Sequence, residues 1–308
     1  MNPQPPADDV LRVIPAVLTP QTPDLAPDLD LFVRHCRWLL GTGADGLGVL
    51  GTTGEANSFS VRERVQLLEA LATGGIAGNR VIAGTGCCAI PDTVELSKAA
   101  LAIGAAGVLW LPPFYYKNPK DDGIYRAFAE SIERIGDPRL RVYLYHFPQQ
   151  SAVPLSVDLV GRLIAGFPGV VVGLKDSAGD FAYTETLVRR FPGFRVYPGS
   201  ESFLLDGLKI GASGTISASC NVTAPLAADV VARWRAGRDA GAVQDRLSKI
   251  RTAIQGYPLT PALKAIMARH TKDRRWLAVR PPFVALSEKE TAELSAKLDA
   301  AQFDLAAA

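Results

Sequence analysis

The sequence predicts a parallel α/β fold in which eight strand–helix units close into a (β/α)8 TIM barrel with a C-terminal helical extension. Short apolar, β-branched runs alternate about eight times with helix-like stretches up to residue 223. Beyond that point the strand signal stops, and apolar residues recur at helical spacing. We therefore expect a barrel with the active site at residues 1–223, and a helical region at residues 224–308 packed on it.

The expected strands are short apolar runs bounded by turn residues. They lie at residues 13–18, 46–50, 81–84, 107–111, 141–145, 171–175, 195–197 and 214–217. Successive runs start roughly 20 to 35 residues apart, and this interval fits β/α units better than helical repeats.

The helices expected between these strands carry apolar residues three and four positions apart. They lie at residues 28–40, 61–72, 93–103, 124–135, 157–165, 183–190 and 203–210. Ser60-Val61-Arg62-Glu63 has the capping-box pattern, and Pro91 with Asp92 marks the start of the third helix. Breaks near residues 256–258 and 280–282 divide the extension.

The composition is that of an ordinary globular protein, with 308 residues, 48% hydrophobic, 21% charged and a formal net charge of +2. The sequence has no dense block of Lys and Arg, so it gives no sign of nucleic-acid or membrane binding. No apolar stretch approaches the roughly 20 residues that span a bilayer. Residues 1–6 lack the basic and apolar segments of a signal peptide. We expect a cytoplasmic protein whose partner is a small molecule.

The four cysteines are Cys36, Cys87, Cys88 and Cys220. Their number and spacing match neither a disulfide framework nor a C-x-x-C metal pair. We expect them to be reduced and to act as small buried hydrophobic residues.

The candidate for covalent chemistry is Lys175, which ends an apolar run and precedes a polar turn that begins at Asp176. Burial disfavours the ammonium form, so a lysine leaving a buried strand is suited to attack a carbonyl. A salt bridge to Asp176 or Asp180 explains the same pattern, and the residues alone leave both interpretations open.

Polar motifs follow several other expected strands, and in a parallel barrel the carboxyl ends of the strands form the active-site rim. The motifs are Gly51-Thr52-Thr53-Gly54-Glu55, Pro112-Pro113-Phe114-Tyr115-Tyr116, Tyr145-His146 and Pro198-Gly199-Ser200-Glu201. Hydroxyl groups, phenols, an amine and glycine turns are thus expected to converge there.

Together with Gly173-Leu174-Lys175-Asp176, these motifs resemble the dihydrodipicolinate synthase/N-acetylneuraminate lyase family of class I, pyruvate-type aldolases, over nearly the whole chain. The resemblance implies a Schiff-base lyase, an aldolase or a dehydratase, that acts on pyruvate or a hydroxylated 2-keto acid. Lys175 would form the imine, and Thr52 and Tyr145 would relay protons. Tyr116 would complete the relay across a subunit interface, which implies a homodimer or homotetramer.

The substrate carboxylate would be held by backbone N–H groups and hydroxyls at Thr52 and Thr53. The other candidates for substrate binding are Gly51, Ser177, Gly199, Ser200, Glu201, Ile216, His146 and Gln150. Several site candidates have a structural alternative. Thr52 and Glu55 could form a capping box, the Tyr145 ring could be packed, the loop tyrosines could pack on their own subunit, Ser177, Ser200 and Glu201 could be solvent-facing turn residues, and His146 could be a structural residue.

Gln150 departs from the pattern of the dihydrodipicolinate synthases, which typically have arginine there to bind the carboxylate of aspartate semialdehyde. Lys117 and His146 are further departures, and Asp176 replaces the aromatic residue usual in sialic-acid lyases. The resemblance is therefore closest to aldolases of 2-keto-3-deoxy acids or 4-hydroxy-2-oxoglutarate. The alternative is 4-hydroxy-tetrahydrodipicolinate synthase.

The sequence also bears on three rival classes of protein. Residues 41–46 match G-x-G-x-x-G, but they are expected to end a helix and precede a strand, the reverse of a dinucleotide site. A metal-dependent aldolase is disfavoured because His35, His146 and His270 are scattered, so we expect neither a metal nor an organic cofactor. A non-catalytic keto-acid-binding barrel remains the third possibility.

Overall fold

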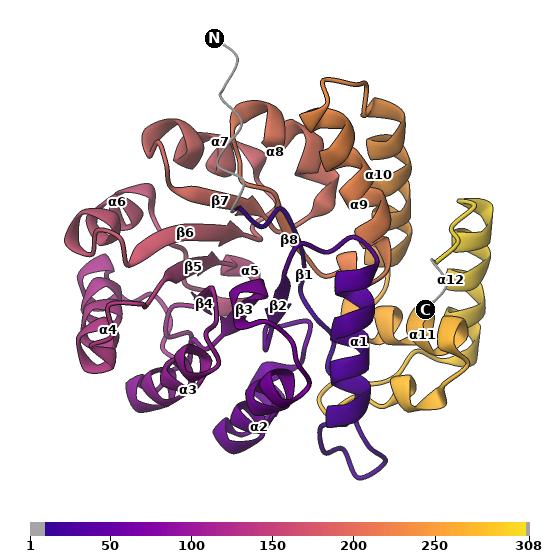
Figure 1. The fold of residues 1–308 in the computed structure, drawn as a ribbon, viewed down its shortest axis with the longest axis horizontal. Helices are drawn as coiled ribbons and strands as arrows, with labels where there is room; N and C mark the ends of the chain where they lie inside the picture. The colour runs from indigo at the N-terminus through magenta and orange to yellow at the C-terminus, as the bar shows by residue number, and fades with distance from the viewer. Residues whose placement is uncertain (1–9, 306–308) are drawn as a thin grey trace.

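The computed structural model describes residues 10–305. Within them, eight parallel strands follow one another around a ring (Figure 1). They are β1 (Val13–Pro15), β2 (Leu47–Val49), β3 (Val81–Gly84), β4 (Gly107–Trp110), β5 (Val142–His146), β6 (Val171–Asp176), β7 (Arg195–Pro198) and β8 (Thr215–Ser217). Hydrogen bonds from Val17 N to Gly48 O and from Ser213 N to Val196 O join the β1–β8 pair to the other six strands. The expected barrel is confirmed.

Helices surround this ring, and further helices extend beyond it on one side (Figure 1). The helices are α1 (Leu29–Gly41), α2 (Val61–Thr73), α3 (Ile90–Ala102), α4 (Asp121–Ile135), α5 (Pro148–Ser151), α6 (Val157–Gly166), α7 (Phe181–Arg190), α8 (Leu204–Ile210), α9 (Cys220–Arg235), α10 (Gly241–Gln255), α11 (Leu259–Thr271) and α12 (Glu288–Ala300).

Local sequence accounts for several helix starts. The Asp28 side chain accepts from Leu31 N at the start of α1, and the capping box at Ser60 forms at the start of α2. The third helix starts at Ile90, earlier than the expected position 93, because Pro91 fits its first turn.

The boundary expected between residues 223 and 224 falls inside α9. This helix follows β8 and packs against β1, so it completes the barrel, and the extension consists of α10 to α12. The expected breaks at residues 256–258 and 280–282 lie between these helices. Residues 41–46 end α1 and precede β2, as expected, and the φ of 112° at Gly43 suits glycine there.

The core is divided into three groups of apolar side chains. One group fills the space between strands and helices, and a second joins α10, α11 and α12 to the barrel. The third lies inside the barrel and consists of Ile14, Ile82, Leu109, Tyr143, Tyr145, Tyr197 and Ile216. Cys36 and Cys220 are buried as expected, whereas Cys87 is half-buried and Cys88 is exposed on the loop after β3.

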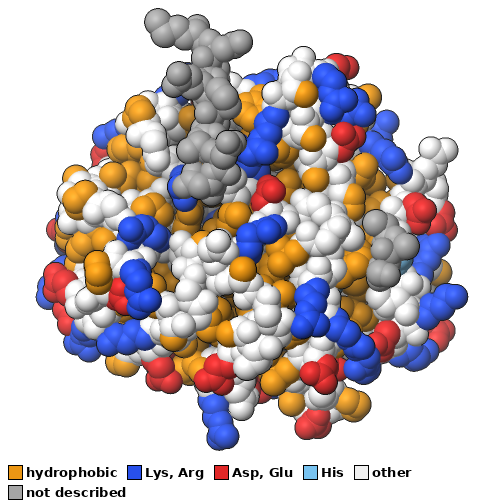
Figure 2. All heavy atoms as spheres, viewed as in Figure 1, with side chains coloured by type: hydrophobic (Ala, Val, Ile, Leu, Met, Phe, Trp, Pro, Cys, Tyr) orange, Lys and Arg blue, Asp and Glu red, His pale blue; other side chains and the backbone are white. Residues whose placement is uncertain are grey.

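The surface carries both signs of charge. In Figure 2, Lys and Arg side chains alternate with Asp and Glu over the face shown, without a large region of one sign. In residues 10–305, no helix combines the length and apolar character needed to cross a membrane. Residues 1–6, where we expect no targeting signal, lie outside the described residues.

Candidate active site

A cavity of about 780 Å³ opens where the strands end. Its wall includes the expected site residues Thr52, Thr53, Gln150, Tyr145, Lys175, Ser177, Gly199 and Ser200. Strands β2, β5, β6 and β7 therefore direct the polar groups after their last residues toward one space, as the carboxyl ends of a parallel barrel should.

Lys175 and Tyr145 are neighbours because β5 and β6 pair with a register shift between Val142 and Tyr143. Val142 pairs with Val171 but Tyr143 pairs with Gly173, so β6 contains one extra residue, a β-bulge. Without this residue Tyr145 would stand beside Leu174. The bulge therefore places Tyr145 opposite Lys175.

The contact between the two side chains is direct. Lys175 Nζ donates to Tyr145 Oη at 3.2 Å and lies 4.3 Å from the centre of the tyrosine ring. Lys175 is 5% exposed and Tyr145 is 3% exposed. A buried amine at the cavity wall with a phenol as its hydrogen-bond partner is chemically suited to attack a carbonyl.

Ion pairing does not account for Lys175. Asp176 accepts hydrogen bonds from Thr184 Oγ1 and Ala178 N, and Asp180 caps α7 through Ala182 N. Burial raises the pKa of Asp176, and the hydrogen bonds from Thr184 and Ala178 oppose this rise. Neither carboxylate lies within ion-pair distance of the Lys175 amine.

The loop after β2 holds its two threonines in a sharply turned backbone. Leu50 and Glu55 both have positive φ, at 58° and 56°, which is unusual for residues with a Cβ atom. A Cβ at Gly54 would lie 2.8 Å from Val17 O, so glycine is required there. The turn brings Thr52 Oγ1 to 3.5 Å from Tyr145 Oη, and extends the row from Lys175 through Tyr145 to Thr52.

Thr52 and Glu55 do not form a capping box. The Glu55 carboxylate instead forms a fully buried ion pair with Lys264 of α11 and accepts from Arg280 N at 2.8 Å. Thr260 Oγ1 also donates to Thr53 O at 3.3 Å. The C-terminal extension thus contacts and stabilises the threonine loop through Thr260, Lys264 and Arg280.

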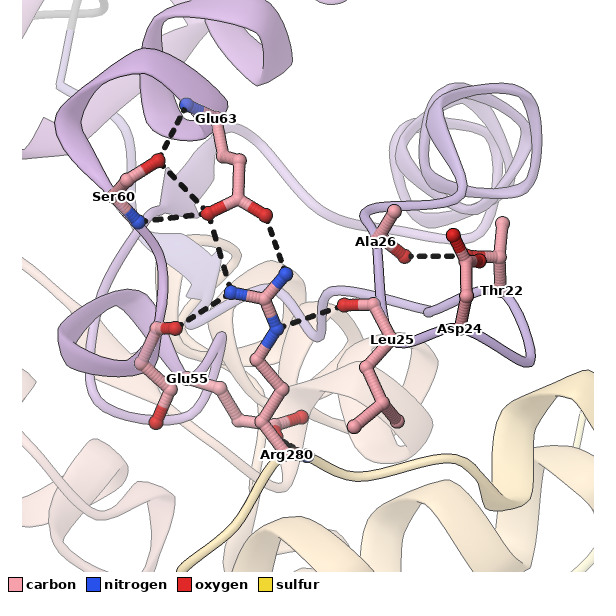
Figure 3. A network of polar contacts seen from close by, with 9 residues as sticks. Thr22, Asp24, Leu25, Ala26, Glu55, Ser60, Glu63 and Arg280 are labelled. Atoms are coloured by element: carbon pink, nitrogen blue, oxygen red, sulfur yellow. Dashed lines mark hydrogen bonds and ion pairs between the residues drawn. The ribbon is translucent and has the colours of Figure 1, made fainter.

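Arg280 adds a second attachment (Figure 3). Its guanidinium donates to Leu25 O at 2.7 Å and Ser58 O at 2.6 Å, and forms an ion pair with Glu63 at the start of α2. The pKa of Glu63 is lowered to about 2, chiefly because the hydrogen bond from Arg280 stabilises the carboxylate.

The cavity wall does not include five of the other candidates. Glu201 is buried between Ser217 Oγ and Thr223 Oγ1, and His146 stacks on Tyr183 while its Nδ1 accepts from Leu155 N. Ile216 is packed inside the barrel, and Gly51 lines a smaller hollow beside Tyr145. Tyr116 is 79% exposed on the loop after β4, in edge contact with Tyr115.

Several cavity residues were missed by the sequence analysis. Ser248, Arg251, Thr252 and Gln255 of α10 form one side of the cavity, together with Pro258, Leu259 and Thr260. The polar residues recur at three- and four-residue spacing along α10, beside the buried Leu247, Ile250 and Ile254. That pattern marks a polar helix face, but solvent explains such a face equally well.

Within residues 10–305, no group of three His, Cys, Asp or Glu side chains is placed to hold a metal ion.

Residues 9–301 match the model of the dihydrodipicolinate synthetase family. The chain belongs to this family. Its members are lyases and synthases, so the protein is an enzyme. A DapA-like lyase from Chloroflexus aurantiacus is 38% identical over 290 residues, which span 92% of this chain and 94% of the relative.

Solved structures of the family agree closely in fold. Dihydrodipicolinate synthase from Agrobacterium tumefaciens is 34% identical with a TM-score of 0.85, over 94% of this chain and 99% of the other. YagE from E. coli, described in complex with pyruvate, is 26% identical with a TM-score of 0.88, over 96% and 99%. The family resemblance inferred from the motifs is therefore confirmed, over nearly the whole chain.

Proposed function

We propose that this enzyme is a class I lyase that forms an imine between Lys175 and pyruvate or a hydroxylated 2-keto acid. The observation that carries the proposal is the buried Lys175 amine, 3.2 Å from the Tyr145 hydroxyl at the wall of the cavity. The pyruvate described in the YagE structure adds support for the class of substrate.

In the proposed reaction, the Lys175 amine adds to the C2 carbonyl of the keto acid, and water leaves as the iminium forms. For a 4-hydroxy-2-keto acid, the C4 hydroxyl loses its proton, the C3–C4 bond breaks and C4 leaves as an aldehyde or ketone, while the iminium accepts the electron pair and becomes an enamine. Protonation at C3 followed by hydrolysis of the imine then frees pyruvate and the Lys175 amine. Tyr145 would move protons at the carbonyl and hydroxyl oxygens, with Thr52 next in the row. Backbone and hydroxyl groups of Thr52 and Thr53 would bind the C1 carboxylate.

Tyr116 would take part only in an oligomer. Its side chain is 79% exposed and does not line this subunit's cavity, so its hydroxyl would serve a neighbouring subunit in a dimer or tetramer. Native mass spectrometry of the protein tests this part of the proposal, and a monomer that is fully active would contradict it.

4-Hydroxy-tetrahydrodipicolinate (dihydrodipicolinate) synthase is the second candidate, because the Agrobacterium relative is named dihydrodipicolinate synthase. Gln150, which lines the cavity, counts against it. A neutral amide lacks the charge and the paired donors with which a guanidinium binds the carboxylate of aspartate semialdehyde.

Borohydride reduction in the presence of pyruvate tests the proposal. The expected result is a pyruvyl adduct on Lys175, located by peptide mapping, that is absent from Lys175→Ala and present in Lys209→Ala. Lys209 is an exposed lysine in α8 and serves as the matched control. An adduct that persists in Lys175→Ala, or a folded wild-type enzyme that forms none with pyruvate or other 2-keto acids, would contradict the imine mechanism.

A further inference from the structure

Arg251 lines the cavity but has no role in the imine mechanism proposed above. It lies in α10, in the wall of the cavity, and its Nη1 donates to Ser219 Oγ at 2.8 Å. Ser219 is buried directly after β8, at the start of α9. The guanidinium is therefore fixed at the same rim of the barrel as Lys175.

The charge of Arg251 is not balanced by an acidic side chain. No carboxylate in residues 10–305 lies within ion-pair distance of its guanidinium, and its Nε is buried without a hydrogen-bond partner. Arg251 and Lys175 are the two cationic side chains in the cavity wall. An arginine has five N–H donors, and within residues 10–305 only Ser219 accepts a hydrogen bond from this one, so donors of the terminal nitrogens remain for a ligand.

The neighbouring side chains indicate what that ligand is. Ser248, Thr252 and Gln255, from the same helix, line the cavity together with Arg251 and bring hydroxyl and amide groups to this wall. Asp176 and Asp180 also line the cavity and disfavour a strongly charged anion. On the α10 side of the wall there is one cation with neutral polar groups, which suits a singly charged carboxylate, whereas a phosphate dianion calls for more positive charge.

We infer that Arg251 binds a second carboxylate, at the end of the substrate that is remote from the keto group. This inference rests on the proposed imine at Lys175 and narrows its substrate class to 2-keto dicarboxylates. In this arrangement Thr52 and Thr53 hold the C1 carboxylate, and Arg251 of α10 holds the remote carboxylate. The helical extension thereby determines specificity.

Imine trapping with matched acids tests Arg251 without any need for turnover. The probes are 2-oxoglutarate against 2-oxopentanoate, and 2-oxoadipate against 2-oxohexanoate, which differ within each pair only in the terminal carboxylate. We expect the wild-type enzyme to reach half-maximal borohydride trapping on Lys175 at a roughly tenfold or more lower concentration of the diacid, in at least one pair. Arg251→Gln should remove this preference, and Arg251→Lys should restore part of it.

Lys249→Gln is the matched control, because it removes one positive charge from an exposed position two residues away on α10. It should keep the preference for the diacid. No diacid preference in the wild-type enzyme, or a preference that survives in Arg251→Gln, overturns the assignment of Arg251. If pyruvate is trapped in the same experiment, the failure concerns Arg251 alone; if no acid is trapped, the proposed imine itself has failed.

Discussion

The hydroxyl of Tyr145 lies between Lys175 Nζ at 3.2 Å and Thr52 Oγ1 at 3.5 Å, and its role can be tested by removing one atom. Tyr145→Phe should lower kcat by about 10² to 10⁴, because proton transfer loses its positioned group, while the ring keeps its packing. Steady-state kinetics with the substrate identified by trapping measures the effect.

Tyr143→Phe is the control for this change. It removes a hydroxyl from the same strand, but that hydroxyl accepts from Arg195 and does not line the cavity. We expect kcat to change by less than about threefold in the control. Equal losses in both variants would assign Tyr145 to packing.

At the same scale, sequence position identified which residues reach the rim but not where their side chains point. Lys175, Tyr145 and Thr52 meet, whereas Glu201 turns inward to Ser217 and Thr223. A residue after a strand can point into the cavity or back into the barrel. Partners distant in the sequence decide between these directions, and no local pattern records them.

Among the elements, α11 is attached to the threonine loop through the buried pair of Lys264 and Glu55. Lys264→Met should destabilise the protein by about 3 to 5 kcal/mol, because it leaves the Glu55 carboxylate buried without its partner. Urea unfolding measures the loss. Lys289→Met breaks an exposed pair with Glu293 and should cost about 0 to 1 kcal/mol. A loss of similar size in the two variants would show that the buried pair contributes little.

The order and type of the elements could be predicted from periodicity, since parallel strands and amphipathic helices have distinct repeats. The bulge that aligns Tyr145 with Lys175 could not, because it is a property of two strands and leaves no mark on either alone. The contribution of α10 to the cavity could not be predicted from the sequence either. Its polar residues face inward only because the extension folds back over the carboxyl ends of the strands.

At the scale of the whole molecule, two buried histidines, His35 and His146, make stability depend on pH. Burial lowers the pKa of each to about 4, although the hydrogen bond to Asn221 partly opposes this effect at His35. In the unfolded chain a histidine titrates near 6.5. The unfolded state therefore binds more protons between these values, so stability is fully present above about pH 6.5 and is lost as pH falls toward 4.

The loss should reach about 1.4 kcal/mol per pH unit for each histidine in the middle of this range, as seen in urea unfolding at pH 7.5, 6.5, 5.5 and 4.5. Burial raises the pKa of Asp176, so this carboxylate makes the folded state more stable as pH falls toward 4, which opposes the effect of the histidines. Comparing variants that lack the histidines isolates their contribution. His146→Gln should keep an acceptor for Leu155 N and reduce the slope between pH 6.5 and 5.5 by about half, and adding His35→Gln should nearly abolish the slope in this interval, which lies above the titration of Glu63 in either state. An unchanged slope in the double variant would mean that both rings gain a proton as readily in the folded protein as in the unfolded chain.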